Sequence, residues 1–188
     1  MKLFFHFAVV GFSNSYLIGP EGGGDAIIVD PGIFDVPTLK LIEDNNYSVK
    51  YVLLTHGHEA HIYGLKTLMK VYNAKIYAAS PRIYEFPVNR VADRDMIELA
   101  GEKVEVIEVP GHTNDSVVYR IRNLLFTGDV IGAGDTGSTP NAYARALLKN
   151  TIQEKLFTLP DNYVILPGHG PPSTIETEKQ FNTGLQEG

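Results

Sequence analysis

Hydrophobic residues recur along this chain in short runs that end at turns, a pattern typical of buried β-strands. One run, Ala26–Val29, ends at Asp30-Pro31-Gly32, and another, Tyr51–Leu54, ends at a group of histidines. Between Lys103 and Val109, apolar and charged residues alternate, as expected of a strand with one buried face. These patterns predict strands at 2–10, 14–18, 26–29, 51–54, 74–78, 103–109, 116–121, 124–127 and 163–166.

Longer segments carry the spacing of helices. Between 62 and 72, Leu65, Leu68, Met69 and Tyr72 recur at helical intervals, so we expect them to face the core. Similar patterns predict helices at 37–45 and 142–157 and a last helix that begins near Ile175. Two segments lack a clear period: 80–100, which Pro81 and Pro87 interrupt, and the glycine-rich loop 132–139.

The order of these elements is strands first and then strands mixed with helices, and this order occurs twice. No linker or repeat divides the 188 residues, a length typical of one domain, so we expect a single domain over 1–188. The order suggests two sheets packed together with helices outside. The pattern by itself favours the α/β or the α+β class.

Three of the six histidines lie within the segment Thr55–His61, directly after the strand at 51–54. Loops at the carboxyl ends of strands are where α/β sheets place their chemistry. His56 and His58 are two residues apart in an extended turn, so both imidazoles can reach one metal ion. The alternative is a polar turn with solvated histidines, which the density of histidines makes the weaker interpretation.

Ligand-type residues follow strand-like runs at three later places: His112, Asp129 and His169, each beside a glycine. Each one alone is better explained as a turn or loop residue. Together with the first group they form a set of nitrogen and oxygen ligands without sulfur, suited to a borderline or hard transition metal. His6 lies within a predicted strand and is interpreted as structural, and Asp30, before Pro-Gly, as a turn residue.

In this order the motifs resemble those of the metallo-β-lactamase superfamily: Thr55-His56-Gly57-His58, His61, Gly111-His112-Thr113, Gly128-Asp129 and Gly168-His169-Gly170. The end of the chain resembles the glyoxalase II (hydroxyacylglutathione hydrolase) branch. The resemblance implies an αββα sandwich of the α+β class, with two mixed sheets packed face to face and helices on the outer faces. It also implies that His56, His58 and His112 hold one metal, that His61 and His169 hold a second, and that Asp129 bridges them.

The chain departs from the family pattern at three places. Ala60 stands where the motif has an aspartate that binds the second metal, and the neighbouring Glu59 is better explained as an acid at the start of a helix. The loop 132–140 lacks the arginines of the glyoxalase II branch. The chain ends 19 residues after His169, without that branch's C-terminal helical domain, which argues against glutathione thioesters as substrates.

Composition narrows the function further. The net charge of −6 argues against a nucleic-acid partner, and the absence of cysteine excludes disulfides, thiolate metal sites and cysteine nucleophiles. No apolar run has the length of a membrane span, and the N-terminus lacks a signal-peptide cleavage site, so we expect no membrane association and a cytoplasmic location. The expected partner is a small-molecule substrate, and the sequence does not address the oligomeric state.

The sequence therefore predicts an enzyme, a metal-dependent hydrolase of a small thioester or ester, with one or two zinc ions and with iron or manganese as alternatives. In this hypothesis Asp129 helps to position and activate the attacking water. The loss of a ligand at Ala60 leaves two further hypotheses open. One is a mononuclear iron dioxygenase that acts on persulfides, a class the superfamily also contains. The other is a degenerate metal-binding protein with little activity.

Overall fold

The computed structural model describes residues 1–9 and 11–186, and its chain divides into two compact units. Unit 1 comprises Met1–Val91 and Glu98–Glu102, and unit 2 comprises Ala92–Ile97 and Lys103–Gly188. The predicted last residue of the first strand, Val10, lies outside the described residues, as do the last two residues of the polar tail. Each unit contains a mixed six-stranded sheet together with helices, so the predicted α+β class is confirmed.

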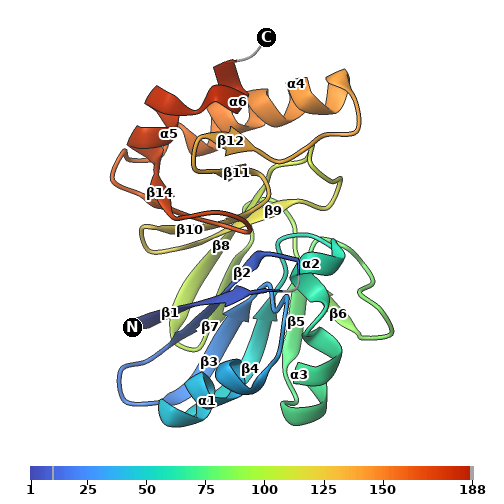
Figure 1. The fold of residues 1–188 in the computed structure, drawn as a ribbon, viewed down its shortest axis with the longest axis vertical. Coiled ribbons are helices and arrows are strands. Elements are labelled where there is room, and N and C mark those ends of the chain that lie inside the picture. Colours follow the sequence, from blue (N-terminus) through green and yellow to red (C-terminus); the bar gives the residue numbers. More distant parts are fainter. Residues whose placement is uncertain (10, 187–188) are drawn as a thin grey trace. The chain divides into compact units, whose positions relative to one another are not determined.

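Unit 1 is built on a sheet with the order β1-β2-β3-β4-β5-β6 (Figure 1). The first three strands pair antiparallel, and β3 to β6 pair parallel. The strands are β1 (Lys2–Ala8), β2 (Ser13–Gly19), β3 (Gly24–Val29), β4 (Tyr47–Leu53), β5 (Lys75–Ala78) and β6 (Val88–Arg90). Because β3 and β4 are parallel, their carboxyl ends lie at the same edge of the sheet. Asp30 follows β3, and the histidine-rich segment Thr55–His61, called the histidine loop below, follows β4.

Helices α1 (Val36–Asp44), α2 (Glu59–Ile62) and α3 (Leu65–Val71) complete unit 1. One buried apolar cluster joins the helices to the sheet: it contains Ile42 of α1, Leu65 and Leu68 of α3, and Ile28 and Val52 of the sheet. The removal of these side chains from water stabilises the packing of the helices on the sheet. The helix predicted at 62–72 is therefore correct in its buried face but interrupted near Gly64. The Gly64 amide donates to the Pro31 carbonyl at 2.9 Å, and a side chain here would overlap the backbone at Ile33.

The second sheet has the order β14-β13-β10-β9-β8-β7 and belongs to unit 2, except for Glu98 and Leu99 of β7 and Glu102 of β8, which are counted in unit 1. Strand β10 pairs parallel with β13, whereas β9 pairs antiparallel with both β8 and β10. The strands are β7 (Met96–Leu99), β8 (Glu102–Glu108), β9 (Val117–Ile121), β10 (Leu124–Gly128), β13 (Val164–Pro167) and β14 (Ser173–Thr174). A separate small hairpin consists of β11 (Ile131–Gly132) and β12 (Asp135–Thr136).

The helices of unit 2 are α4 (Ala142–Thr151), α5 (Ile175–Phe181) and α6 (Thr183–Gln186). A π-helical turn, Ile152–Leu156, continues α4, and the Phe157 amide reaches the Ile152 carbonyl at 3.0 Å. The predicted helix at 142–157 therefore has nearly the correct extent but changes type in its last turn. Leu148, Ile152 and Ile175 pack in one buried cluster with Leu125 and Ile165 of the sheet.

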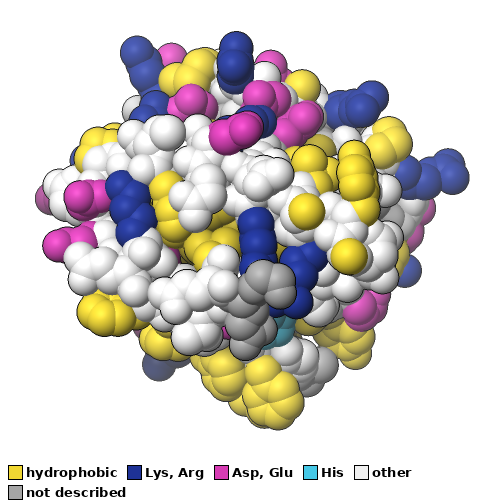
Figure 2. Space-filling view, turned by 90° about the horizontal axis from the view of Figure 1, so that it is seen from above, with side chains coloured by type: hydrophobic (Ala, Val, Ile, Leu, Met, Phe, Trp, Pro, Cys, Tyr) yellow, Lys and Arg dark blue, Asp and Glu magenta, His cyan; other side chains and the backbone are white. Residues whose placement is uncertain are grey.

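The surface carries charges of both signs. Figure 2 shows acidic and basic side chains interspersed on one face, without a continuous area of either sign. Over residues 1–9 and 11–186, no helix has the length and apolar character needed to cross a bilayer.

Candidate metal centre

The structure brings the three histidines of the first motif together within unit 1. The His56 ring centroid lies 4.6 Å from that of His58 and 4.4 Å from that of His61. Their positions follow from local structure: β4 ends at Leu53, a loop that bends at Thr55 carries His56 and His58, and α2 then places His61 in its single turn. His56 and His61 are buried, whereas His58 is exposed.

Asp30 is the residue whose role the sequence did not predict. Its carboxylate is buried, and it accepts hydrogen bonds from the Thr55 amide at 2.8 Å and the Thr55 hydroxyl at 2.6 Å. His61 Nδ1 lies 3.2 Å from the same carboxylate. The interpretation of Asp30 as a turn residue is therefore incomplete: its φ of +47° does turn the chain, but its side chain organises the histidine loop.

These contacts fix the tautomers of two histidines. Asp30 can only accept, so His61 Nδ1 carries the proton and His61 Nε2 keeps its lone pair. The single hydroxyl proton of Thr55 is donated to Asp30, so Thr55 Oγ1 accepts from His56 Nδ1, which lies 3.1 Å away. His56 Nε2 is then also an electron-pair donor. A carboxylate behind a histidine is a frequent arrangement at metal sites.

Two serines of strand β2 hydrogen-bond to the backbone at Asp30 and at Ala60 of the histidine loop. Ser13 Oγ donates to the Ala60 carbonyl at 2.6 Å, and Ser15 Oγ donates to the Asp30 carbonyl at 2.6 Å. Next to them, burial and, to a smaller extent, the charge of Asp30 raise the pKa of Tyr16, although a hydrogen bond with Asn14 lowers it. Tyr16 is therefore neutral at physiological pH.

Glu59 is the first residue of α2, as the sequence predicted. Its carboxylate accepts from the Tyr84 hydroxyl at 3.0 Å, and the Lys66 ammonium lies 4.3 Å from the Tyr84 ring centroid. Burial, the hydrogen bond to Glu59 and nearby negative charge raise the pKa of Tyr84 to about 12, so its hydroxyl stays a donor. Glu59 thus hydrogen-bonds to the segment around Tyr84. The position of Glu59 in the histidine motif did not indicate this contact.

The structure brings the three later candidates together within unit 2. Asp129 Oδ2 lies 3.6 Å from His112 Nε2 and 3.6 Å from His169 Nε2. These distances exceed those of a hydrogen bond, but two ligand atoms on one tetrahedral zinc ion are separated by about 3.4 Å. His112 Nδ1 lies 2.7 Å from the Ser138 carbonyl, which can only accept, so Nε2 of His112 is the electron-pair donor. The arrangement fits a cation between these side chains.

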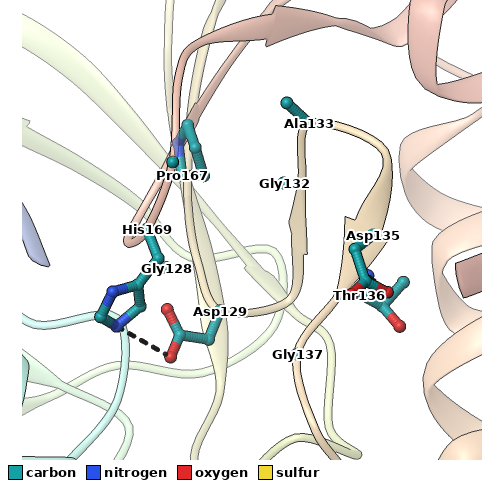
Figure 3. A pocket seen from close by; sticks show the side chains of 10 residues that line it. Gly128, Asp129, Gly132, Ala133, Asp135, Thr136, Gly137, Pro167 and His169 are labelled. Atoms are coloured by element: carbon teal, nitrogen blue, oxygen red, sulfur yellow. Dashed lines mark hydrogen bonds and ion pairs between the residues drawn. The ribbon is translucent and has the colours of Figure 1, made fainter. Parts of the chain in front are cut away.

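Glycines and a threonine hold this group in place. Gly128 ends β10 with φ +50°, and Thr127 Oγ1 donates to the Ile131 carbonyl at 2.8 Å, which closes the turn that carries Asp129. A cavity of about 220 Å³ opens beside Asp129 and His169. Figure 3 shows the His169 ring facing the Asp129 carboxylate, with the β11–β12 hairpin as the opposite wall.

Replacing Gly137 with alanine is expected to destabilise this group. A Cβ at Gly137 would overlap the Asp129 carbonyl and lie 2.8 Å from His112 Nδ1. We expect a loss of about 1–3 kcal/mol in the free energy of unfolding, measured by denaturant titration, because overpacked sites must shift their neighbours. Gly132→Ala is the matched control, since its Cβ would make ordinary 3.5 Å contacts in the same loop. Equal stability of the two variants would contradict the expected overlap.

Comparisons with known proteins give one family model and several relatives. The sequence model described as "Metallo-beta-lactamase superfamily" matches residues 8–169. The chain is 34% identical over 208 residues to an uncharacterized protein of Mycobacterium tuberculosis (strain ATCC 25618 / H37Rv), with 92% of each chain covered. It is 32% identical over 188 residues to a hydroxyacylglutathione hydrolase of Prochlorococcus marinus (strain NATL1A), covering 87% of this chain and 74% of that protein.

Among solved structures, the structure of this chain is similar to the crystal structure of ETHE1 from Myxococcus xanthus. The TM-score is 0.89 at 26% identity, and the match covers 100% of this chain and 86% of the other.

Proposed function

Because this chain belongs to the metallo-β-lactamase superfamily, we propose that it is a metal-dependent hydrolase of a small thioester or ester. The observation that carries the proposal is the position of Asp129 Oδ2, 3.6 Å from an imidazole Nε2 on either side. Such a set of imidazole nitrogens and a carboxylate oxygen suits zinc, with iron and manganese as alternatives.

The family motifs suggest the assignment of the proposed ligands. In that assignment His56, His58 and His112 would hold one metal, His61 and His169 a second, and Asp129 would contribute to both. A metal held there would polarise a carbonyl oxygen and lower the pKa of a bound water. The chain's own residues have separate tasks: Asp30, Thr55 and the Ser138 carbonyl keep protons on Nδ1 of His61, His56 and His112, so that Nε2 is available.

The lining of the cavity supports a small substrate. Its volume of about 220 Å³ is below the usual range for drug-sized ligands, about 300–1,000 Å³. Glycines, Ala133 and Pro167 supply much of the wall, and neither lysine nor arginine is among its lining residues. We therefore propose that it accepts a short, uncharged acyl group. The hydroxyacylglutathione hydrolase relative makes thioesters the first class to test.

The test is a hydrolysis assay with short acyl thioesters and aryl acetates on protein as purified, after chelation, and after reconstitution with zinc, iron or manganese. We expect thioester hydrolysis that chelation abolishes and one of the metals restores. Hydrolysis that survives complete metal removal would contradict the proposal, as would no turnover in any metal form.

Replacing Ala60 with aspartate is expected to raise metal occupancy from one to two ions per chain. The change supplies the carboxylate that the motif has at this position and that the methyl group of alanine cannot replace. Metal analysis of the purified variant measures the ratio, and Ala60→Asn, of the same size but uncharged, is the control. Unchanged metal content in Ala60→Asp would mean that Ala60 does not occupy the motif position.

A second candidate function is an iron-dependent persulfide dioxygenase. The absent carboxylate at Ala60 favours it, because a mononuclear iron site needs fewer ligands than a two-metal site. Protein purified aerobically with iron, and oxygen uptake on addition of glutathione persulfide, would support this function. Zinc content together with no oxygen uptake would eliminate it.

A further inference from the structure

Two buried polar residues near the end of the chain have no part in the proposed metal site. Glu178 in α5 is 2% exposed, and Asn182, between α5 and α6, is 1% exposed. Buried carboxylates and amides are costly unless they are hydrogen-bonded, so their partners indicate what they do. The partners lie 44 to 50 residues earlier in the chain, in the β11–β12 hairpin.

The contacts run from the two side chains to the hairpin backbone. Glu178 Oε2 accepts from the Gly134 amide at 2.9 Å, and Asn182 Nδ2 donates to the carbonyls of Gly132 at 3.3 Å and Asp135 at 3.0 Å. Asn182 Nδ2 also donates to Glu178 Oε2 at 2.6 Å, and Ser173 Oγ donates to Glu178 Oε1. The two residues therefore form one connected group.

Helix α6 adds a second set of contacts to the same turn. The Thr183 amide and hydroxyl both donate to the Gly134 carbonyl at 3.0 Å. Gly134 has φ +83°, a conformation that favours glycine, and the closeness of Gly184 to Asp135 leaves no room for a side chain at Gly184. Contacts from α5 and α6 thus hold the turn in addition to the short pairing of β11 with β12, which joins two residues on each strand.

The other side of this hairpin lines the cavity beside Asp129 and His169. Gly132 and Ala133 of the hairpin line the cavity together with these two side chains, and the labelled view in Figure 3 shows them across from His169. A Cβ on Gly132 would touch the His169 carbonyl and Pro167 at 3.5 Å, so the hairpin packs directly on the strand end that carries His169. A shift of the hairpin would change the width of the cavity.

From this geometry we infer that Glu178 and Asn182 are positioning residues that set substrate affinity by holding the β11–β12 hairpin as the cavity wall. The side-chain hydrogen bonds of both residues go to the hairpin, to Ser173, to the Leu185 amide and to each other, and none involves a proposed metal ligand. Their loss is therefore expected to act on substrate binding and to leave metal content unchanged. The kinetic part of this inference rests on the proposed hydrolase function, whereas the structural part does not.

The test uses Asn182→Asp, which keeps the size of the side chain and replaces the donor with an acceptor. Its new oxygen would face the Gly132 and Asp135 carbonyls and Glu178 Oε2, all of which are acceptors. We expect amide hydrogen exchange over 132–136 of the metal-loaded protein to become about tenfold faster, because buried hydrogen bonds are lost there. KM for the thioester is expected to rise about tenfold, with kcat changed less than about threefold and metal content unchanged.

Asn123→Asp, the same substitution at an exposed turn of unit 2, is the matched control and is expected to change none of these quantities. Thr183→Val, which removes one donor to the Gly134 carbonyl from an exposed position, replaces Asn182→Asp if that variant does not fold. Unchanged exchange over 132–136 would overturn the inference, as would faster exchange with unchanged KM or a loss of metal. If the wild-type protein hydrolyses no thioester, the proposed function fails, and hydrogen exchange alone decides whether these residues hold the hairpin.

Discussion

Asp129→Asn is expected to lower the rate of hydrolysis about 10³-fold and to remove most of the bound metal. The Asp129 carboxylate places one oxygen 3.6 Å from Nε2 of both His112 and His169. Asparagine keeps the shape but has one neutral oxygen and an amide nitrogen that cannot bind a cation. A 10³-fold lower rate corresponds to about 4 kcal/mol less electrostatic stabilisation of the transition state. Steady-state kinetics and metal analysis of the same preparation measure both effects.

Asp135→Asn is the control for this prediction. Asp135 lines the same cavity, is exposed, and accepts from the Thr136 amide through Oδ1, a role that asparagine can also fill. We expect it to retain its metal and its rate within about twofold, because exposed substitutions of this type have small effects. If Asp129→Asn also kept full activity and metal, Asp129 would not be a ligand.

Asp30→Asn is expected to weaken metal binding about 10- to 100-fold while the protein stays folded. Asparagine tolerates the φ of +47° at this position and can still accept from the Thr55 amide. Its Nδ2 group, in place of Oδ2, would face both Thr55 Oγ1 and His61 Nδ1, which must then accept. The proton of His61 moves to Nε2, and the Thr55 hydroxyl turns its proton to His56 Nδ1, so that the proton of His56 also moves to Nε2. Neither Nε2 can then bind a metal. Removal of such supporting carboxylates typically costs this factor in affinity.

A competition titration with a metal chelator, together with circular dichroism, separates metal affinity from folding in this variant. Asp35→Asn serves as the control, because it removes a negative charge from unit 1 at the N-cap of α1, where asparagine caps equally well. Its metal affinity should match that of the wild type. An unchanged affinity in Asp30→Asn would show that the carboxylate does not set the protonation of His61.

The sequence predicted these ligand-type residues as one metal-binding set, because each of them follows a strand at a turn, and the structure gathers them in one group within each unit. His56, His58 and His61 converge in unit 1, and Asp129 lies near both His112 and His169 in unit 2. Long strands and buried helix faces were also predicted, since their apolar period is a local property of the chain. Whether the two groups share metal ions stays a prediction.

Features that depend on distant partners were not predictable. Asp30 precedes Pro-Gly and therefore looks like a turn residue, and its role depends on Thr55 and His61, 25 and 31 residues away. The strands β6, β7, β11, β12 and β14 have two to four residues each, too few to show a period, and exist because neighbouring strands pair with them. Glu178 shows its role only through a turn 44 residues earlier.

We propose that five histidines and Asp129 hold one or two catalytic metal ions, a claim that the metal content of the wild-type protein tests most directly. We predict that protein purified without chelators contains at least one equivalent of zinc, iron or manganese per chain, and that metal-free protein takes up the same amount on titration. Protein that contains no transition metal and binds none when zinc or iron is added would contradict the claim.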